Sequence, residues 1–186
     1  MSDANLKRLC PSLYFSSGVK AILRCFFWDG LALRCFIRDM LVHGDSRAAV
    51  VLSASPLLVA CYCDDLDGVC VLRFCEDLAR EYGLRPGSRL VTVLNSRSRG
   101  TPARPEEIAS DLIQGNEANP CYLNFWPLVA EFLSDDVSVI EARKREIAEE
   151  EYHRCRSLGE KHLRRFGGVA RDGRPDRSET PAQVIA

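Results

Sequence analysis

Three apolar segments follow one another in the middle of the chain, and the connections between them are too short to hold a helix. The segments are residues 48–53 (AAVVLS), 56–63 (PLLVACYC) and 69–74 (VCVLRF). Ser55 and Pro56 interrupt the first pair, and the residues DDLDG join the second. Parallel strands need a crossover of a dozen or more residues, whereas antiparallel strands can be joined by a tight turn. The spacing therefore predicts an antiparallel or mixed sheet.

A helix and a fourth strand follow, and this element order predicts an α+β fold. Residues 75–83 (CEDLAREYG) place apolar side chains on one helical face and end at a glycine. Residues 89–95 (RLVTVLN) have the composition of a strand. A chain of 186 residues can bury a sizeable core without disulfides. We therefore expect a globular domain over residues 1–134, with a small sheet of about four strands and helices on one face.

An amphipathic helix is expected before the sheet. Asp29 is a good N-cap residue and Gly44 a good residue to end the helix. Between them an apolar stripe recurs at helical spacing, formed by Leu33, Phe36, Ile37, Met40 and Leu41. Residues 19–28 (VKAILRCFFW) fit either a strand or a helix. Residues 1–18 have weak periodicity and predict an irregular lead-in.

The segment after the fourth strand predicts a loop and two short helices. Residues 96–107 (SRSRGTPARPEE) are rich in Ser, Arg, Gly and Pro, which is typical of a loop. One short helix is expected after Pro105. Another is expected over residues 124–133, with Pro127 in its first turn, where the ring is tolerated.

The C-terminal region predicts a single long charged helix, packed on the domain or projecting from it. Residues 135–166 contain no proline, and Gly159 is a possible weak point. A thin apolar seam is formed by Ile140, Ile147, Cys155 and Leu158. Such a seam with interleaved charge fits a helix on its own core, or one that binds a protein partner over residues 137–166. Residues 167–186 have little to bury and predict a disordered tail.

The charge pattern argues against a nucleic-acid or membrane partner. The chain has 25 basic and 26 acidic residues, a net charge of −1, which gives no global field to attract nucleic acid. The apolar stretch 21–42 contains five charged residues, and each would cost about 3 kcal/mol at membrane depth. We see no targeting segment near the N-terminus. The expected protein is soluble and cytoplasmic.

Nine cysteines are expected to be reduced and to pack as small apolar residues. The odd number argues against a complete disulfide framework. Cys61 and Cys63 share a face of one expected strand. A type I turn at Asp65–Gly68, with Gly68 in the left-handed region, would set Cys63 opposite Val71. A slipped register would instead bring Cys70 across from Cys61 and cluster three thiols.

The acidic turn does not have the spacing of a known metal site. With Gly68 at the sixth position of a helix–loop–helix calcium loop, Cys63 and Phe74 would stand where carboxylates are required. The chain also lacks a CxxC pair in this region, the spacing typical of zinc sites. On the later helix, Cys155 and His162 lie about 10 Å apart, too far to share a metal. The sequence therefore predicts no metal and no cofactor.

Two groups of residues remain as candidate sites. His43 could act as a base for a cysteine of the sheet, and Cys63 is the candidate nucleophile. Arg97, Arg99 and Arg104 lie in the loop after the fourth strand, where they could contact an anion or nucleic acid. That loop lacks the glycine spacing of nucleotide-binding loops.

The sequence contains no GxSxG, HExxH or nucleotide-binding motif and no obvious pair of catalytic carboxylates. We therefore expect a non-enzymatic protein that binds another macromolecule. The alternatives are a small cysteine-dependent enzyme, and a regulator that binds an anion or nucleic acid through the 96–104 arginine loop.

Overall fold

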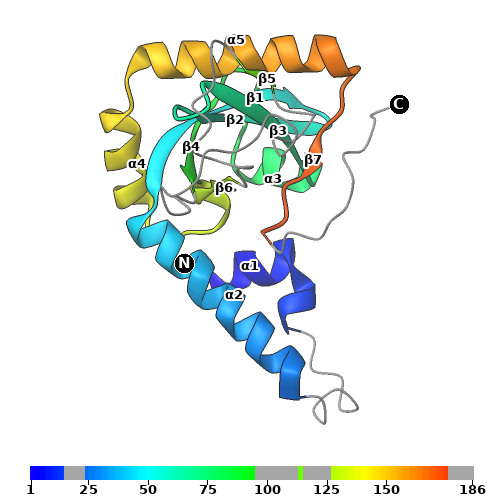
Figure 1. Cartoon of the computed structure of the whole chain (residues 1–186), viewed down its shortest axis with the longest axis vertical. Coiled ribbons are helices and arrows are strands. Elements are labelled where there is room, and N and C mark those ends of the chain that lie inside the picture. The colour runs from blue at the N-terminus through cyan, green and yellow to red at the C-terminus, as the bar shows by residue number, and fades with distance from the viewer. Residues whose placement is uncertain (15–23, 95–112, 115–126, 176–186) are drawn as a thin grey trace.

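The computed structural model describes residues 1–14, 24–94, 113–114 and 127–175, and its centre is a mixed β-sheet (Figure 1). Six strands follow the order β5-β3-β2-β1-β4-β6, and β7 also pairs with β3. The pairs along the main path are antiparallel, whereas β7 runs parallel to β3. The strands are β1 (Asp45–Ala54), β2 (Leu57–Cys63), β3 (Gly68–Phe74), β4 (Arg89–Leu94), β5 (Ile113–Gln114), β6 (Leu128–Val129) and β7 (Arg171–Asp172).

The α+β class and the mixed sheet are confirmed, but the expectation of about four strands is wrong. The four predicted strands are β1 to β4, and three two-residue strands extend the sheet. Two residues are too few to show an alternating pattern, so periodicity could not reveal them. Residues 124–133 illustrate this, because Leu128 and Val129 pair with β4 and a 3-10 turn, η4 (Ala130–Phe132), follows. A helix was expected there.

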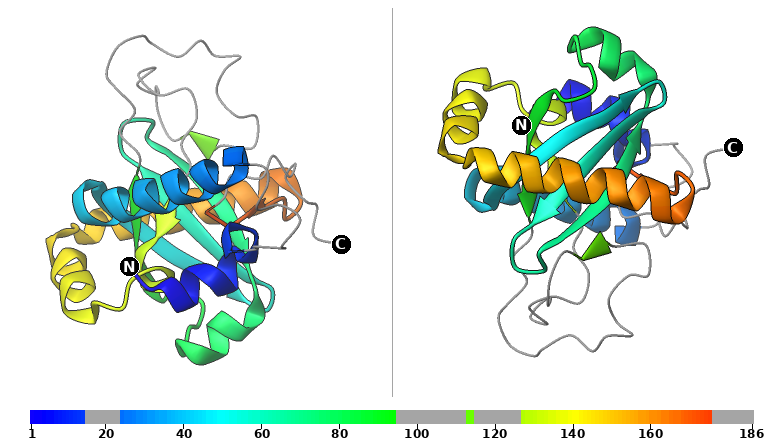
Figure 2. Two further views of the ribbon diagram at one scale, coloured as in Figure 1. Left: turned by 90° about the horizontal axis from the view of Figure 1, so that it is seen from below. Right: turned by 90° about the horizontal axis from the view of Figure 1, so that it is seen from above.

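Helices cover both faces of the sheet, and not one face as predicted (Figure 2). Alternate residues of a strand point to opposite faces. Ala48 and Val50 of β1 pack with α5, whereas Ala49 and Val51 pack with residues of the other helices. The helices are α1 (Asp3–Leu9), α2 (Arg24–His43), α3 (Glu76–Glu81), α4 (Val137–Glu146) and α5 (Glu149–Phe166), with a 3-10 turn η1 (Pro11–Tyr14).

The predicted inner stripe of α2 is largely confirmed. Ile37, Met40 and Leu41 are buried in the core, and Leu33 and Phe36 pack against it while partly exposed. The helix begins at Arg24, so Asp29 lies inside it and is not its N-cap. Figure 1 shows that α2 extends beyond the sheet, with α1 and η1 beside it. The lead-in is therefore partly helical, which the sequence did not predict.

The expected single helix over residues 135–166 is two helices. Ile147 and Ala148 have extended ψ angles of 125° and 146°, and the chain turns a corner between α4 and α5. No proline or glycine marks this break, so breaker residues could not predict it. Gly159, the expected weak point, lies inside α5 and against the sheet. A Cβ built there would be 2.7 Å from that of Ala60, so glycine allows the close approach.

The hairpin between β2 and β3 has the slipped register. Cys61 pairs with Cys70 and Cys63 with Gly68, so the predicted pairing of Cys63 with Val71 is wrong. The turn closes where the N–H of Asp67 donates to the carbonyl of Asp64 at 2.9 Å. Asp67 has a φ of 37°, which aspartate tolerates better than most side chains. The left-handed residue is therefore Asp67, not Gly68.

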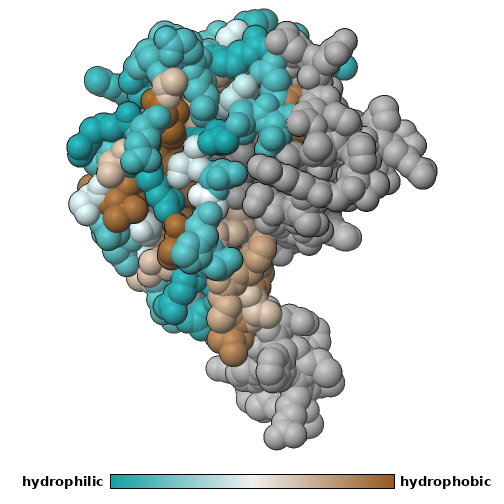
Figure 3. All heavy atoms as spheres, turned by 60° about the vertical axis from the view of Figure 1, so that its left-hand side comes forward, coloured by the Kyte–Doolittle hydropathy of each residue, from teal (hydrophilic) through white to brown (hydrophobic). Residues whose placement is uncertain are grey.

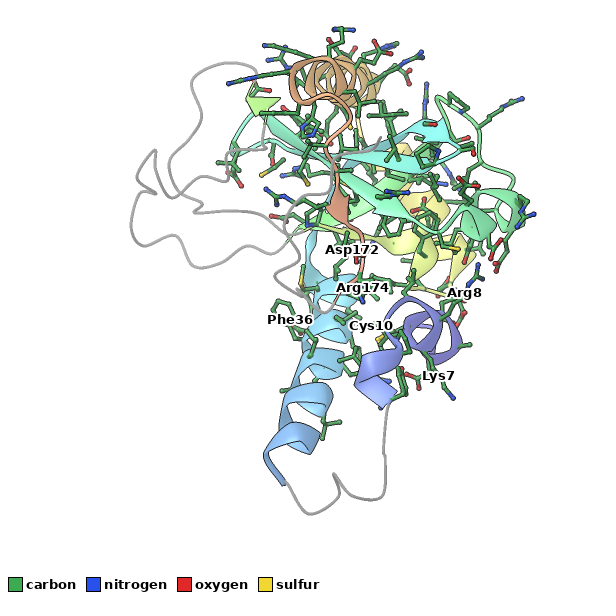
Figure 4. The ribbon with its side chains drawn as sticks, turned by 90° about the vertical axis from the view of Figure 1, so that its right-hand side faces the viewer. Lys7, Arg8, Cys10, Phe36, Asp172 and Arg174 are labelled. Carbon is green, nitrogen blue, oxygen red and sulfur yellow. The ribbon has the colours of Figure 1, made fainter. Side chains whose placement is uncertain are left out.

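The chain after α5 returns to the sheet and runs toward α1 and α2 (Figure 4). Ala170 and Arg171 are buried, and the N–H of Gly173 donates to the carbonyl of Arg73 at 2.9 Å. Arg174 forms an ion pair with Asp172 at 2.7 Å. These residues belong to the stretch expected to be a disordered tail, and strand pairing with β3 orders them. Residues 176–186 of that stretch lie outside the described residues.

None of the helices in the described ranges combines the length and the apolar character needed to cross a bilayer.

Candidate functional site

The structure does not bring His43 and Cys63 together as a nucleophile and its base. His43 ends α2 with its side chain exposed, and its Nε2 lies 4.0 Å from a carboxylate oxygen of Asp39. Cys63 ends β2 and is buried in the core. Burial raises the pKa of the Cys63 thiol to about 12, although the backbone N–H of Leu66 donates to the sulfur. A thiol with this pKa is almost entirely protonated at neutral pH and is a poor nucleophile.

The remaining candidate residues are the arginines of the 96–104 loop and the residues Cys155 and His162 of α5. Arg97, Arg99 and Arg104 lie outside the described residues. On α5, Cys155 is buried with its sulfur 3.4 Å from the carbonyl oxygen of Ala60. Nε2 of His162 lies 2.7 Å from the carbonyl oxygen of Val169, on the same buried side of the helix.

One group of potential metal ligands occurs among the described residues, at the start of the β2–β3 turn. The sulfur of Cys63 and the carboxylates of Asp64 and Asp65 offer ligand atoms within 4.8 Å of one another. Asp64 already pairs with Arg47 at 2.6 Å, and the neutral thiol is a weak ligand. Cys61 and Cys70 are not members of this group. The contacts are those of a closed hairpin turn, and they do not favour a metal ion.

A hollow of about 440 Å³ lies where the α2–β1 and α4–α5 junctions meet. Its walls come from the end of α2, the start of β1, the end of α4 and the start of α5. The ionisable residues there are His43, Asp45, Arg47, Arg143, Glu146 and Glu151, and the apolar ones include Val42 and Ile147. The break at Ile147 and Ala148 is what opens this space beside the sheet.

The two arginines of the hollow are already engaged, but two of its carboxylates are not. Arg47 pairs with Asp64, and Arg143 donates to the carbonyl of Val42 at 3.0 Å. Glu151 accepts the N–H of Ala48 at 2.6 Å, and burial raises the pKa of its carboxyl. The side chains of Asp45 and Glu146 form no hydrogen bond or ion pair with a residue in the described ranges, although Arg47 attracts the Asp45 carboxylate electrostatically. The hollow is therefore lined by charges of both signs, with Arg47 and Arg143 beside Asp45, Glu146 and Glu151.

Apolar side chains line the outer face of α2 beside this hollow. The outer stripe of α2 comprises Leu31, Cys35, Arg38 and Val42, spaced at i, i+4, i+7 and i+11. Leu31 and Val42 are each 57% exposed, and Cys35 is also exposed. Figure 3 shows apolar side chains at the surface on the side of the molecule that carries α2 and α4. An apolar stripe at helical spacing normally faces a core, and this one faces outward.

α4 adds one residue to the same surface. Val139 is 45% exposed and lies one turn before Arg143, which contacts the end of α2. Val137 is 67% exposed, but its position on the helical wheel is on the opposite flank of α4. We call the outer stripe of α2 together with Val139 the α2–α4 surface. The sequence pattern of residues 31–42 contains this stripe, but the inner stripe has more apolar residues, and only the inner stripe was predicted.

Comparison of the chain with protein-family models, with curated proteins and with solved structures finds no match in any of the three.

Proposed function

We propose that the protein works by binding another protein through the α2–α4 surface. The observation that supports this proposal is the exposure of Leu31 and Val42 at helical spacing on a helix whose opposite stripe is buried. A helix that is apolar on two sides usually has a second packing partner. Exposed apolar patches with a polar rim are typical of interaction sites.

The proposal moves the expected partner contact from the whole 137–166 region to α2 and α4. α5 buries its own apolar residues on the sheet, and its outward positions are polar. α4 contributes Val139 to the proposed surface. A cysteine-dependent enzyme is not favoured, because Cys61, Cys63 and Cys70 of β2 and β3 are buried, and burial raises the pKa of the Cys63 thiol.

Site-specific photo-crosslinking tests the proposal. Benzoylphenylalanine replaces Cys35 on the α2–α4 surface or, as the control, Cys75, an exposed cysteine at the start of α3. After irradiation in an extract of the native host, we expect a discrete adduct from position 35 and none from position 75. Leu31→Glu with Val42→Glu should abolish it, and the matched Val137→Glu should not. Equal labelling from both positions would contradict the proposal.

A further inference from the structure

The outer stripe of α2 is spaced symmetrically about its own midpoint. It reads Leu31, Cys35, Arg38 and Val42, so the outer spacings are four residues and the central one is three. When two such helices lie antiparallel about this midpoint, Leu31 of each copy faces Val42 of the other, and Cys35 faces Arg38. The stripe is therefore complementary to itself, as an interface with two-fold symmetry requires.

The charged residues at the centre of the stripe fit the antiparallel arrangement. Arg38 and its neighbour Asp39 are both exposed. Side chains of a helix lean toward its N-terminus, so Arg38 leans toward the level at which Asp39 of the other copy stands. The small side chain of Cys35 leaves room for the guanidinium between the helices. The arrangement thus holds two equivalent contacts between an arginine and an aspartate, and such complementary charges favour one specific pairing.

Neither charged group has a strong contact within its own chain. Arg38 forms no ion pair with a described residue, although it attracts the Asp3 carboxylate electrostatically. A carboxylate oxygen of Asp39 lies 4.0 Å from Nε2 of His43, and both side chains are exposed. A parallel pairing in register would set Arg38 against Arg38 and Asp39 against Asp39, and like charges in an interface disfavour association. The charges therefore select the antiparallel direction.

α4 widens the apolar area that receives Leu31 of the other copy. Val139 is 45% exposed and lies one turn before Arg143, whose guanidinium donates to the carbonyl of Val42 at the end of α2. In the antiparallel arrangement, Leu31 of one copy reaches Val42 of the other with Val139 beside it. Figure 1 shows that α2 extends beyond the sheet, which keeps the Leu31 end of its outer face away from the sheet of its own chain.

Resting on the proposed function, we infer that the partner on the α2–α4 surface is a second copy of the chain, held by antiparallel packing of α2 on α2. Leu31 packs against Val42 and Val139 of the other copy, and Arg38 pairs with its Asp39. Few residues of each copy take part, and small interfaces are typical of weak, transient complexes. We expect a dissociation constant of about 10 μM or higher. In dilute solution the chain is then a monomer with its outer stripe exposed.

Sedimentation of the purified chain over a range of concentrations tests the dimer. We expect a reversible equilibrium between monomer and dimer that Leu31→Glu with Val42→Glu weakens at least about tenfold. Val137→Glu, on the opposite flank of α4, should leave it unchanged. Arg38→Glu and, separately, Asp39→Lys should each weaken the dimer about three- to tenfold. Combining these two changes should restore it, because opposite charges face each other again. Melting curves of each variant confirm that the fold is retained.

Engineered cysteines report the direction of packing. In a background with Cys35→Ser and Cys75→Ser, one chain carries Leu31→Cys and another carries Val42→Cys. Antiparallel packing sets these two positions opposite each other, whereas two copies of either chain hold theirs about 16 Å apart along the helix axis. With oxidised glutathione as the oxidant, the mixture should form a disulfide-linked dimer at least about ten times faster than either chain alone. The background chain without either introduced cysteine is the control.

The outcomes separate this inference from the proposed function. A dimer that Leu31→Glu with Val42→Glu does not weaken, or one that links faster through either single chain than through the mixture, would overturn the inference. A chain that stays monomeric at its highest soluble concentration, while position 35 crosslinks to a different protein in the extract, would overturn the inference and leave the proposed function standing. A monomer that gives no discrete adduct from position 35 would overturn both.

Discussion

The two long helices of this protein, α2 and α5, are similar in length but differ in the side chains on their outward faces. α2 has 20 residues and α5 has 18. Both bury one stripe. The outward positions of α5 are polar or charged, namely His153, Arg156, Ser157, Lys161, Arg164 and Arg165. The outward stripe of α2 contains Leu31, Cys35 and Val42. Within the described residues, α5 thus buries all of its apolar face, whereas α2 leaves Leu31 and Val42 exposed.

Thiol chemistry gives the largest expected contrast between the two helices. Cys35 on α2 is exposed, whereas Cys155 on α5 is buried, and burial raises the pKa of its thiol. In the native state at pH 8, a maleimide should label Cys35 at least about a hundred times faster than Cys155. Peptide mass spectrometry after a time course measures both rates. Comparable rates would mean that α5 detaches from the sheet and that the comparison is wrong.

Adding a methyl group to each helix tests how closely it packs. Gly159→Ala should lower the free energy of unfolding by about 2 kcal/mol, since the new Cβ lies 2.7 Å from that of Ala60 and 2.9 Å from Leu52. Gly30→Ala in α2 is the control. Among the described residues, its Cβ would meet the carbonyl oxygen of Leu13 at 3.6 Å and nothing closer, so alanine should stabilise the helix by about 0.5–1 kcal/mol. Urea denaturation measures both, and stabilisation by Gly159→Ala would contradict the close approach of α5.

An arginine–aspartate pair also connects each helix to another part of the domain. Arg154 of α5 binds Asp67 through two hydrogen bonds of 3.1 and 2.6 Å, and the hydroxyl of Tyr62 donates to the same carboxylate at 2.9 Å. Asp67→Asn should cost about 1 kcal/mol of unfolding free energy. A change no larger than that from removing the exposed pair of Arg156 and Glu160 would show that the hairpin does not hold α5.

The ion pair between Arg34 of α2 and Asp3 should affect stability only through the pH dependence of Tm. The hydroxyl of Tyr14, and then Arg34, donate to Asp3 and hold the pKa of its carboxyl below the ordinary value. A lowered pKa contributes stability above the unfolded-state value, and that stability is lost as the pH falls below about 4. Asp3→Asn should therefore flatten the fall in Tm between about pH 4 and pH 2. An unchanged slope would show that this contact does not anchor α2.

The outer faces should give the smallest effect on stability. Leu31→Ser with Val42→Ser should leave the free energy of unfolding within about 0.5 kcal/mol of wild type, because both side chains are exposed. The same variant should elute earlier from a hydrophobic-interaction column. Lys161→Ser on α5 should change neither property. A loss of more than about 2 kcal/mol would place Leu31 and Val42 in a packed environment and remove the contrast between the helices.

Much of the fold could be predicted because the signals are local. β1 to β4 follow apolar runs between turns, and Ile37, Met40 and Leu41 follow a helical period. What failed depends on contacts distant in sequence. Leu128 and Val129 become a strand because β4 is beside them, and the α4–α5 corner fits both helices around the sheet. The register of the β2–β3 hairpin depends on which of two adjacent residues, Asp67 or Gly68, takes the positive φ.

The candidate site was less predictable than the fold. Exposure of Leu31 and Val42 can be recognised only once the other face of α2 is known to be full. The hollow joins residues about 100 positions apart, at His43 and at Glu146, and no spacing rule connects them. Cys63 illustrates the opposite case, since the sheet cysteines were expected to pack as small apolar residues, and Cys63 is buried in the core.

The contact between β4 and Glu131 also bears on how the protein behaves at high concentration. Both carboxylate oxygens of Glu131 accept the N–H of Val91, at 3.1 and 3.0 Å, and Lys144 neutralises the carboxylate at 3.1 Å. A side chain thus occupies the place where a further strand would hydrogen-bond. Unprotected edges are where sheets of separate molecules join into aggregates. At this edge the sheet ends in a salt bridge, so growth from one molecule into the next has no free N–H of Val91 from which to start.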